Sequence, residues 1–187
     1  MSSDALFASL SDYVNANALP PVENWFPQTE SSIDIRIDHS GNWIHEGGII
    51  RRLSMVRVFS SILRREGSRY YLVTPEVKLE IQVDDVPFLV TNMESSGVGK
   101  SRIVAFVTSA GDYLTLDTKH KLSVEDHGHG AKPYVVVRQD MQALLSRAVY
   151  YQIAEFCSNH RSKPQDKPCL GIWSSGTFFC LADAPIS

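Results

Sequence analysis

Residues 33–43 read Ile-Asp-Ile-Arg-Ile-Asp-His-Ser-Gly-Asn-Trp, and residues 103–113 repeat the pattern as Ile-Val-Ala-Phe-Val-Thr-Ser-Ala-Gly-Asp-Tyr. The second stretch begins 70 positions after the first, and the two agree in their apolar positions, their late glycine and their final aromatic residue. Each predicts a strand, a short loop with Gly in the left-handed conformation, and an aromatic residue that begins the return strand. The repeat therefore predicts two related β-hairpins, and with them two related halves of the chain.

The composition is that of a packed globular protein. Of the 187 residues, 43% are hydrophobic and 21% are charged, which argues against intrinsic disorder. The formal net charge of −3 argues against general nucleic-acid binding, which needs a basic field over much of the surface. Neither a signal-peptide pattern nor an apolar window of bilayer length is present, so we expect a cytoplasmic protein without a membrane span.

The three cysteines are Cys157, Cys169 and Cys180. Their number is odd and no Cys-x-x-Cys pair occurs, so the spacing indicates neither a zinc ribbon nor a disulfide framework. We therefore expect three free or structural thiols in a reducing compartment.

Periodicity predicts an α+β protein of two small domains. Helices are expected over 3–16, 51–65 and 139–157, where apolar residues recur at helical spacing. Strands are expected near 33–37, 42–46, 69–73, 76–84, 88–94, 102–108, 112–117, 133–137, 170–173 and 177–182. Each half then runs hairpin, helix, strand, and each antiparallel sheet is packed by one helix.

The passage between the halves is expected at Val86-Pro87, because Pro interrupts a strand ladder. Residues 1–85 would hold the N-terminal helix and the first repeat domain. Residues 86–187 would hold the second repeat domain, with a loose insertion near 118–132.

Four stretches together resemble an uncharacterised bacterial family, the domain of unknown function 1285 family. They are Gly41–Gly47, Pro20–Trp25, Val136–Arg138 with Arg147–Tyr151, and Gly171–Phe179. The resemblance covers nearly the whole chain. It implies two small domains built from repeated strand and helix motifs, limited similarity to pleckstrin-homology-type folds, and a suggested role in signal transduction. It supplies no catalytic residues to carry over.

A cluster of arginines is the strongest local charge feature. Residues 51–69 contain Arg51, Arg52, Arg57, Arg64, Arg65 and Arg69 against a single acidic residue, Glu66. Guanidinium groups suit carboxylates and phosphates because they donate forked hydrogen bonds. On the expected helix over 51–65, Arg57 and Arg64 would share a face. The alternative is a solvated helix face or internal ion pairing.

We therefore expect a non-catalytic binding module that recognises an acidic protein partner or a small anionic ligand. The expected ligand-binding residues are Trp43, His45, Glu46, Arg51, Arg57 and Arg64. The arginines would supply charge, and Trp43 and His45 would shape the site. Neither a catalytic residue, a metal nor a cofactor is expected.

Two alternatives remain open. One is an enzyme acting on a small metabolite, with His45 and Glu46, or His127 and His129, as general base or metal ligands. The other is a structural role or homo-oligomerisation through exposed strand edges. Ser174 is followed by Ser175-Gly176 but lacks the Gly-x-Ser-x-Gly elbow of a nucleophile, so a hairpin turn is expected there.

Overall fold

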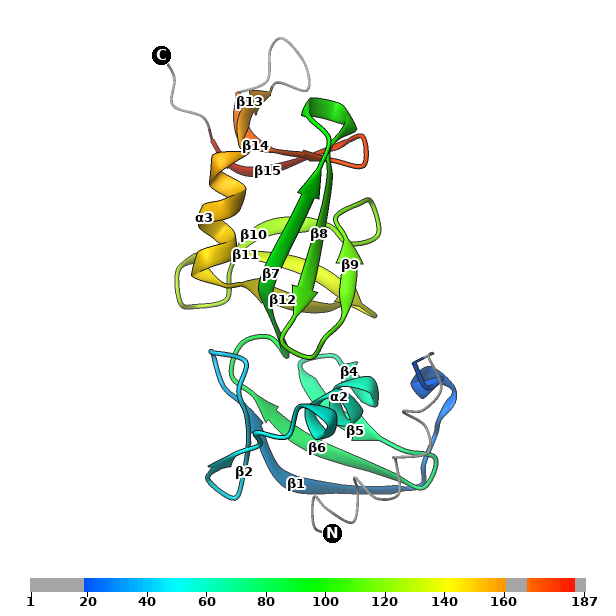
Figure 1. The fold of residues 1–187 in the computed structure, drawn as a ribbon. Helices are drawn as coiled ribbons and strands as arrows, with labels where there is room; N and C mark the ends of the chain where they lie inside the picture. The colour runs from blue at the N-terminus through cyan, green and yellow to red at the C-terminus, as the bar shows by residue number, and fades with distance from the viewer. Residues whose placement is uncertain (1–18, 161–167, 184–187) are drawn as a thin grey trace. The chain divides into compact units, whose positions relative to one another are not determined.

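A computed structural model describes residues 19–160 and 168–183 of the chain. The chain divides into two compact units, Met1–Pro87 and Phe88–Ser187, called unit 1 and unit 2 below. The helix expected over 3–16 lies outside the described residues. Each unit is built on a six-stranded sheet, and unit 2 carries a further sheet of three strands (Figure 1).

The described part of unit 1 begins with a short 3-10 helix, and the strands form the order β3-β2-β1-β6-β5-β4. Its elements are η1 (Val22–Asn24), β1 (Thr29–Ile37), β2 (Trp43–His45), β3 (Gly48–Ile49), α2 (Leu53–Ser61), β4 (Leu63–Glu66), β5 (Arg69–Val73) and β6 (Val77–Val83). Helix α2 contributes Met55, Val56, Val58 and Phe59 to the core, and Phe59 lies against the ring of Trp43.

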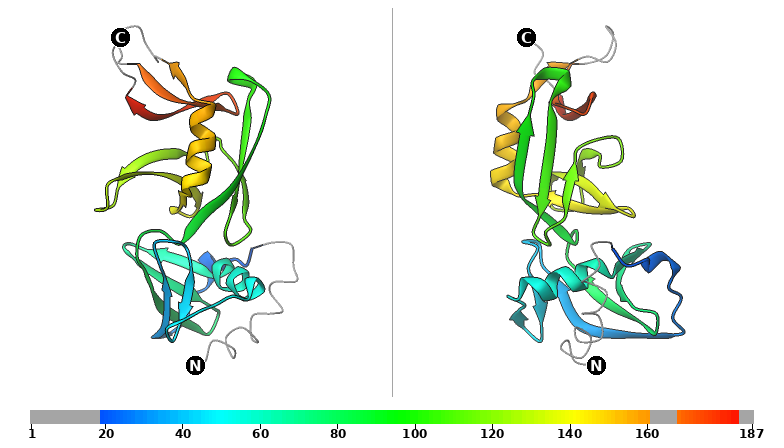
Figure 2. Two further views of the ribbon diagram at one scale, coloured as in Figure 1. Left: turned by 60° about the vertical axis from the view of Figure 1, so that its left-hand side comes forward. Right: turned by 45° about the vertical axis from the view of Figure 1, so that its right-hand side comes forward.

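Unit 2 has a six-stranded sheet in the order β10-β11-β12-β7-β8-β9 and a small sheet β13-β14-β15. Its elements are β7 (Phe88–Ser96), η2 (Gly99–Ser101), β8 (Ile103–Thr108), β9 (Tyr113–Thr115), β10 (Leu122–Asp126), β11 (Ala131–Arg138), β12 (Met141–Leu145), α3 (Arg147–Glu155), β13 (Ser158–His160), β14 (Cys169–Ser174) and β15 (Thr177–Asp183). Helix α3 lies against β7, as both views of Figure 2 show.

The two six-stranded sheets share one topology. In each unit the first three strands form one antiparallel run and the last three form another. The first and last strands of the six then pair in parallel, β1 with β6 and β7 with β12. Each six-stranded sheet is therefore two three-stranded runs joined at one parallel seam, with β3 and β4, or β10 and β9, as its edge strands.

Both repeated stretches form β-hairpins, as predicted. In the first, Gly41 N donates to Asp38 O, and in the second Gly111 N donates to Thr108 O, both at 2.9 Å. Both glycines have positive φ, 76° and 90°. The residue that opens each turn also accepts a backbone N–H through its side chain. The two loops are therefore closed by the same local hydrogen bonds.

These hairpins do not occupy equivalent places in their sheets. The first joins β1 to β2, whereas the second joins β8 to β9, which is one strand further along the shared topology. The sequence repeat thus marks one type of turn used twice. The repetition at the level of the fold is the six-strand topology.

The expected α+β class is wrong, because the protein is mostly β with three sheets and a half-barrel. The two six-stranded sheets are mixed rather than antiparallel, whereas the three-stranded sheet is antiparallel. The hairpin–helix–strand repeat also fails, since α2 lies between the two three-stranded runs of unit 1 whereas α3 follows all six strands of unit 2. The limited similarity to pleckstrin-homology-type folds that the family resemblance implied is not shown.

The helices expected over 51–65 and 139–157 are shorter than predicted, because strands occupy part of each range. The helix over 51–65 ends at Ser61, and Leu63–Glu66 pairs with β5. In the range 139–157, residues 141–145 form β12 with alternating burial, and Gln139 and Asp140 make the preceding turn with positive φ. The expected loose insertion near 118–132 contains strand β10, which pairs with β11.

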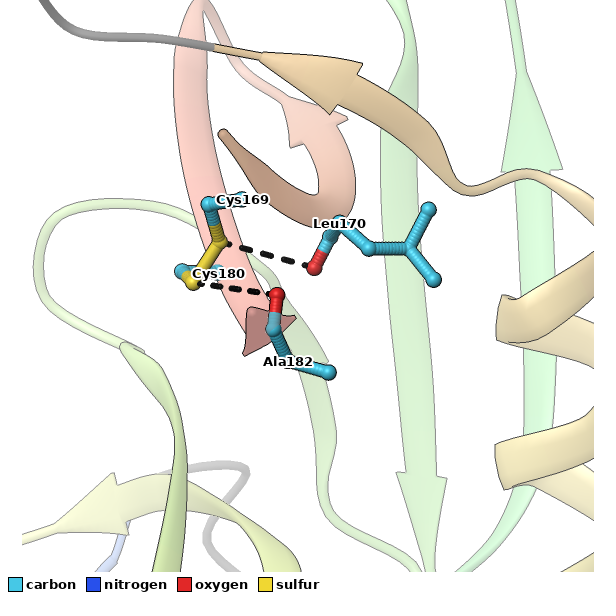
Figure 3. The surroundings of a disulfide bond; sticks show 4 residues. All are labelled: Cys169, Leu170, Cys180 and Ala182. Carbon is cyan, nitrogen blue, oxygen red and sulfur yellow. Dashed lines mark hydrogen bonds between the residues drawn. A yellow bond between two sulfur atoms is a disulfide. The ribbon is translucent and has the colours of Figure 1, made fainter. Parts of the chain in front are cut away.

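A disulfide joins Cys169 in β14 to Cys180 in β15, so the expectation of three free thiols is wrong (Figure 3). A bulge between Leu170 and Gly171 offsets the two strands beside the disulfide. The Sγ atom of Cys169 lies 3.6 Å from Leu170 O, and the Sγ atom of Cys180 lies 3.8 Å from Ala182 O. After reduction, each thiol would therefore have a carbonyl oxygen as hydrogen-bond acceptor. Because disulfides persist mainly in oxidising surroundings, the cysteines no longer argue for a reducing compartment. Separately, none of the helices in the described ranges is long and apolar enough to cross a bilayer.

Candidate functional site

The structure separates the six residues expected to bind a ligand. Trp43 belongs to the core, because it is only 2% exposed and its ring lies 6.1 Å from that of Phe59. It pairs with Ile37 at the closed end of the first hairpin. Its position on the buried face of β2 leaves it no surface with which to shape a site.

His45 is the last residue of β2 and Glu46 follows it, and the two residues have different structural roles. The Nδ1 atom of His45 is 2.8 Å from Asp34 O on the neighbouring strand. Glu46 is exposed and has φ of 48°, and with Gly47 it makes the tight turn to β3. Neither residue hydrogen bonds to the other within the described chain, so the pair does not form an acid–base unit.

Arg64 is a structural tether rather than a neighbour of Arg57. It lies in β4, beyond the end of α2. Its Nη1 donates to Val22 O at 3.1 Å and to Trp25 O at 2.7 Å, and its Nη2 pairs with Glu66. The guanidinium thereby holds the Pro-containing connector against the sheet, and the side chain is only 15% exposed.

We expect Arg64→Met to lower the free energy of unfolding of unit 1 by about 1.5–3 kcal/mol, because two hydrogen bonds from a charged group, to Val22 O and Trp25 O, are lost, although Trp25 N still donates to Val22 O. Urea denaturation checks this value. The matched control is Arg57→Met on the exposed side of α2, which should change stability by less than about 0.5 kcal/mol. Equal stability of the two variants would contradict the tether.

Arg51 and Arg57 remain as the exposed cations of the expected site. Arg51 precedes α2 and Arg57 lies on its solvent side, one helical turn after Leu53, which is 48% exposed. We call Arg51, Leu53, Ser54 and Arg57 the α2 surface; all four are exposed. No carboxylate of the described residues forms an ion pair with either arginine.

Most other arginines are used inside their own unit. Arg36 pairs with Asp84 at 2.7 Å, and Arg138 pairs with Asp112 at 2.6 Å while lying over the Phe88 ring. Arg69 lies 3.7 Å from Glu80. Within the described part of unit 1, Arg51 and Arg57 thus place positive charge at the surface without a carboxylate beside them.

The enzyme alternative expected His127 and His129 to act as general base or metal ligands. His120 contacts Asp117 and His127 contacts Glu125, each at 3.2 Å. Within residues 19–160 and 168–183, no group of three or more His, Cys, Asp or Glu side chains is arranged to hold a metal ion. The structure therefore offers the histidine pair no third ligand among the described residues.

A polar network that the sequence did not reveal surrounds Glu125. Its carboxylate accepts from Ser123 at 2.5 Å and from Gln142 at 2.9 Å, and His127 lies on the other oxygen and stacks on Tyr134. The Ser123 hydroxyl bond is the main reason that the pKa of Glu125 lies below its usual range. Both Ser123 and His127 meet the carboxylate rather than one another, so no activated nucleophile results.

A second surface feature also escaped the sequence reading. Unit 2 has an open hollow beside the first turn of α3, and Arg147 and Tyr150 line it. Sequence reasoning placed both residues in the middle of a helix over 139–157. The signal that was available is Ser146, which caps α3 by accepting from Val149 N and so sets Arg147 at the first helical position.

Comparisons with known proteins agree with this division of the chain. The family model for the N-terminal domain of DUF1285, a domain of unknown function, matches residues 20–86. The model for the C-terminal domain of the DUF1285 proteins of unknown function matches residues 87–181. Among curated proteins, no match to the chain is found.

Two solved structures are similar over much of their length. A DUF1285 family protein from Silicibacter pomeroyi DSS-3 is 35% identical, with a TM-score of 0.78 over 93% of this chain and 94% of its own. A DUF1285 family protein from Shewanella baltica OS155 is 26% identical, with a TM-score of 0.54 over 65% of this chain and 90% of its own.

Proposed function

The chain belongs to the DUF1285 family, whose domains carry no assigned activity, and we propose that it is a non-catalytic binding module whose α2 surface recognises an acidic segment of a partner protein. The observation that carries the proposal is the pair of exposed arginines, Arg51 and Arg57, on either side of exposed Leu53. A segment with carboxylates around one apolar side chain complements this surface in both charge and hydrophobicity. A module of this kind suits the role in signal transduction that the family resemblance implies.

The energies favour a weak and salt-sensitive complex. An exposed ion pair contributes about 0–1 kcal/mol, so two arginines alone cannot hold a partner. Leu53 adds to them, because burying a whole leucine side chain is worth about 1.5–3 kcal/mol and roughly half of this one is exposed. After the entropic cost of association, we expect a dissociation constant in about the micromolar range or weaker.

Fluorescence polarisation with a labelled peptide of alternating Glu and Leu tests the proposal, and a Gln and Leu peptide of the same length is the uncharged probe. We expect wild-type protein to bind the Glu peptide and to lose about tenfold in affinity on R51Q/R57Q, because one decade corresponds to about 1.4 kcal/mol. The matched control is Arg69→Gln in the same unit, whose guanidinium already faces Glu80, and it should change affinity less than about twofold.

Two results would count against the proposal. One is equal binding of the Glu and Gln peptides, which would leave the arginines without a role. The other is an R51Q/R57Q variant that binds as tightly as wild type at low salt. Raising the salt concentration should weaken wild-type binding more than variant binding, since only the former depends on exposed charge.

A further inference from the structure

Unit 2 contains a hollow of about 370 Å³ that is independent of the α2 surface. Its walls come from the outer ends of β10 and β11, the end of β12 and the first turn of α3. Figure 1 shows how β12 leads directly into α3 at this place. The hollow is lined mainly by apolar groups, among them Val124, Pro133, Leu145 and Tyr150.

The apolar lining is open to solvent although most large apolar side chains of the unit are buried. Val124 and Tyr150 are each 38% exposed, whereas Leu145 at the floor is 4% exposed. Tyr150 presents an aromatic ring, and Pro133 a rigid saturated ring, to the same space. A wall of this kind favours the apolar body of a small molecule.

Arg147 gives the hollow its charge. Its Nε and Nη2 donate to the Tyr151 hydroxyl at 3.3 Å and 3.1 Å, which leaves three of the five guanidinium N–H donors. In the part of the chain that the structure describes, no carboxylate pairs with Arg147. Lys132 also lines the hollow and adds a second positive side chain.

The position of Arg147 is unfavourable for α3 itself. It occupies the first helical residue, no acidic residue lies in the first turn, and the helix dipole is positive at this end. A bound anion would offset both the dipole and the guanidinium charge. Asp126, which pairs with the lining residue Ala131, accepts hydrogen bonds from the amides of Gly128 and Gly130.

We propose that this hollow binds a small organic anion with an apolar or aromatic body, whose acid group is held by Arg147 and whose body lies on Val124, Pro133 and Tyr150. The planar fork of donors suits a carboxylate or sulfonate. The volume is at the lower end of the range for ligand sites, about 300–1,000 Å³, so the ligand is a compact acid of one to three rings rather than a dinucleotide.

Two fluorescent probes of nearly the same body test the proposal on the full chain. Anilinonaphthalene sulfonate carries an acid group, and N-phenylnaphthylamine lacks it. We expect the sulfonate to bind in a saturable way at one site and more tightly than the neutral probe. Arg147→Gln should weaken sulfonate binding about tenfold and change binding of the neutral probe less than about twofold.

Two further variants complete the design. Lys119→Gln removes an exposed cation of the same unit outside the hollow and should leave both probes unchanged. Ala131→Trp places a large side chain on the exposed wall and should weaken both probes, with the circular dichroism spectrum confirming that the variant is folded.

The proposal is overturned if the sulfonate binds without saturation, if the neutral probe binds as tightly, or if Arg147→Gln leaves sulfonate binding unchanged. Loss of peptide binding at the α2 surface would not affect any of these outcomes. The two proposals therefore fail or stand separately.

Discussion

Replacing Gly171 with alanine should destabilise unit 2 by about 4 kcal/mol or more. Gly171 is buried in β14, the central strand of the small sheet, between Ser158 of β13 and Cys180 of β15. A Cβ built on this residue overlaps the carbonyl oxygen of Phe179 and lies 2.9 Å from Cζ of the Phe178 ring. The methyl group therefore has no room unless the strands separate.

Neither obstacle can move at low cost. The Phe179 oxygen is part of the backbone of β15, so shifting it disturbs the pairing of the two strands. The Phe178 ring is packed on Trp173, with centroids 5.3 Å apart, and on His160 at 4.7 Å. The φ of Gly171 is not positive, so the requirement for glycine is the close approach of the strands and not backbone conformation.

Urea denaturation of the oxidised protein, followed by the indole N–H signal of Trp173, measures this loss, because Trp173 is the tryptophan of unit 2. Gly48→Ala is the matched control: its nearest neighbour would be His45 O at 3.6 Å, an ordinary contact, and its φ is not positive. The control should stay within about 1 kcal/mol of wild type, and because Gly48 lies in unit 1 its unfolding is followed by the circular dichroism of the whole chain. A Gly171→Ala protein of near wild-type stability would show that the strands can separate freely.

Local sequence signals predicted the parts of the fold that depend on local physics. The hairpin of residues 33–43 follows from alternating burial and from Gly41, whose positive φ closes the loop. The pairing of β1 with β6 has no such signal, because it joins Thr29–Ile37 to Val77–Val83 across four strands and a helix. Parallel seams of this kind are decided by the whole sheet and not by neighbouring residues.

The helix expected over 139–157 included the residues of strand β12, and this error has a physical cause. Residues 141–145, Met-Gln-Ala-Leu-Leu, carry apolar side chains at spacings that satisfy both periods, and short apolar runs are ambiguous for this reason. The turn that separates β11 from β12 uses Gln139 and Asp140 at positive φ, where a Gly would have marked it. Without that mark, the strand and the following helix merged into one predicted helix.

The candidate site was predicted in part, because exposure and partnership are tertiary properties. The density of arginines over 51–69 is visible in the sequence, and five of the six, all but Arg64, are exposed. Arg64 instead bonds to carbonyls 42 and 39 residues earlier in the chain. Main-chain carbonyls are acceptors at every residue, so no side-chain pattern could have identified these partners.

We expect Ser174→Ala to lower the free energy of unfolding of unit 2 by about 3 kcal/mol. The Ser174 hydroxyl is fully buried, donates to Leu116 O at 2.6 Å and accepts from Val104 N at 3.0 Å. Leu116 N also donates directly to Val104 O, so the hydroxyl occupies the place of the second bond of that antiparallel pair. Alanine would leave a buried donor and a buried acceptor unpaired, each at a cost of about 1–3 kcal/mol.

If the two strands moved together so that Val104 N donated directly to Leu116 O, part of this energy would be recovered. The side chains of both residues are fully buried, so their packing opposes this movement. Urea denaturation compares Ser174→Ala with Ser96→Ala, an exposed serine at the end of β7 that should change stability by less than about 0.5 kcal/mol. A loss as small as that of the control would show that the two strands pair without the hydroxyl. The expected loss would instead establish Ser174 as the link that fastens the small sheet to β8, because its oxygen is the one side-chain atom that satisfies both backbone groups.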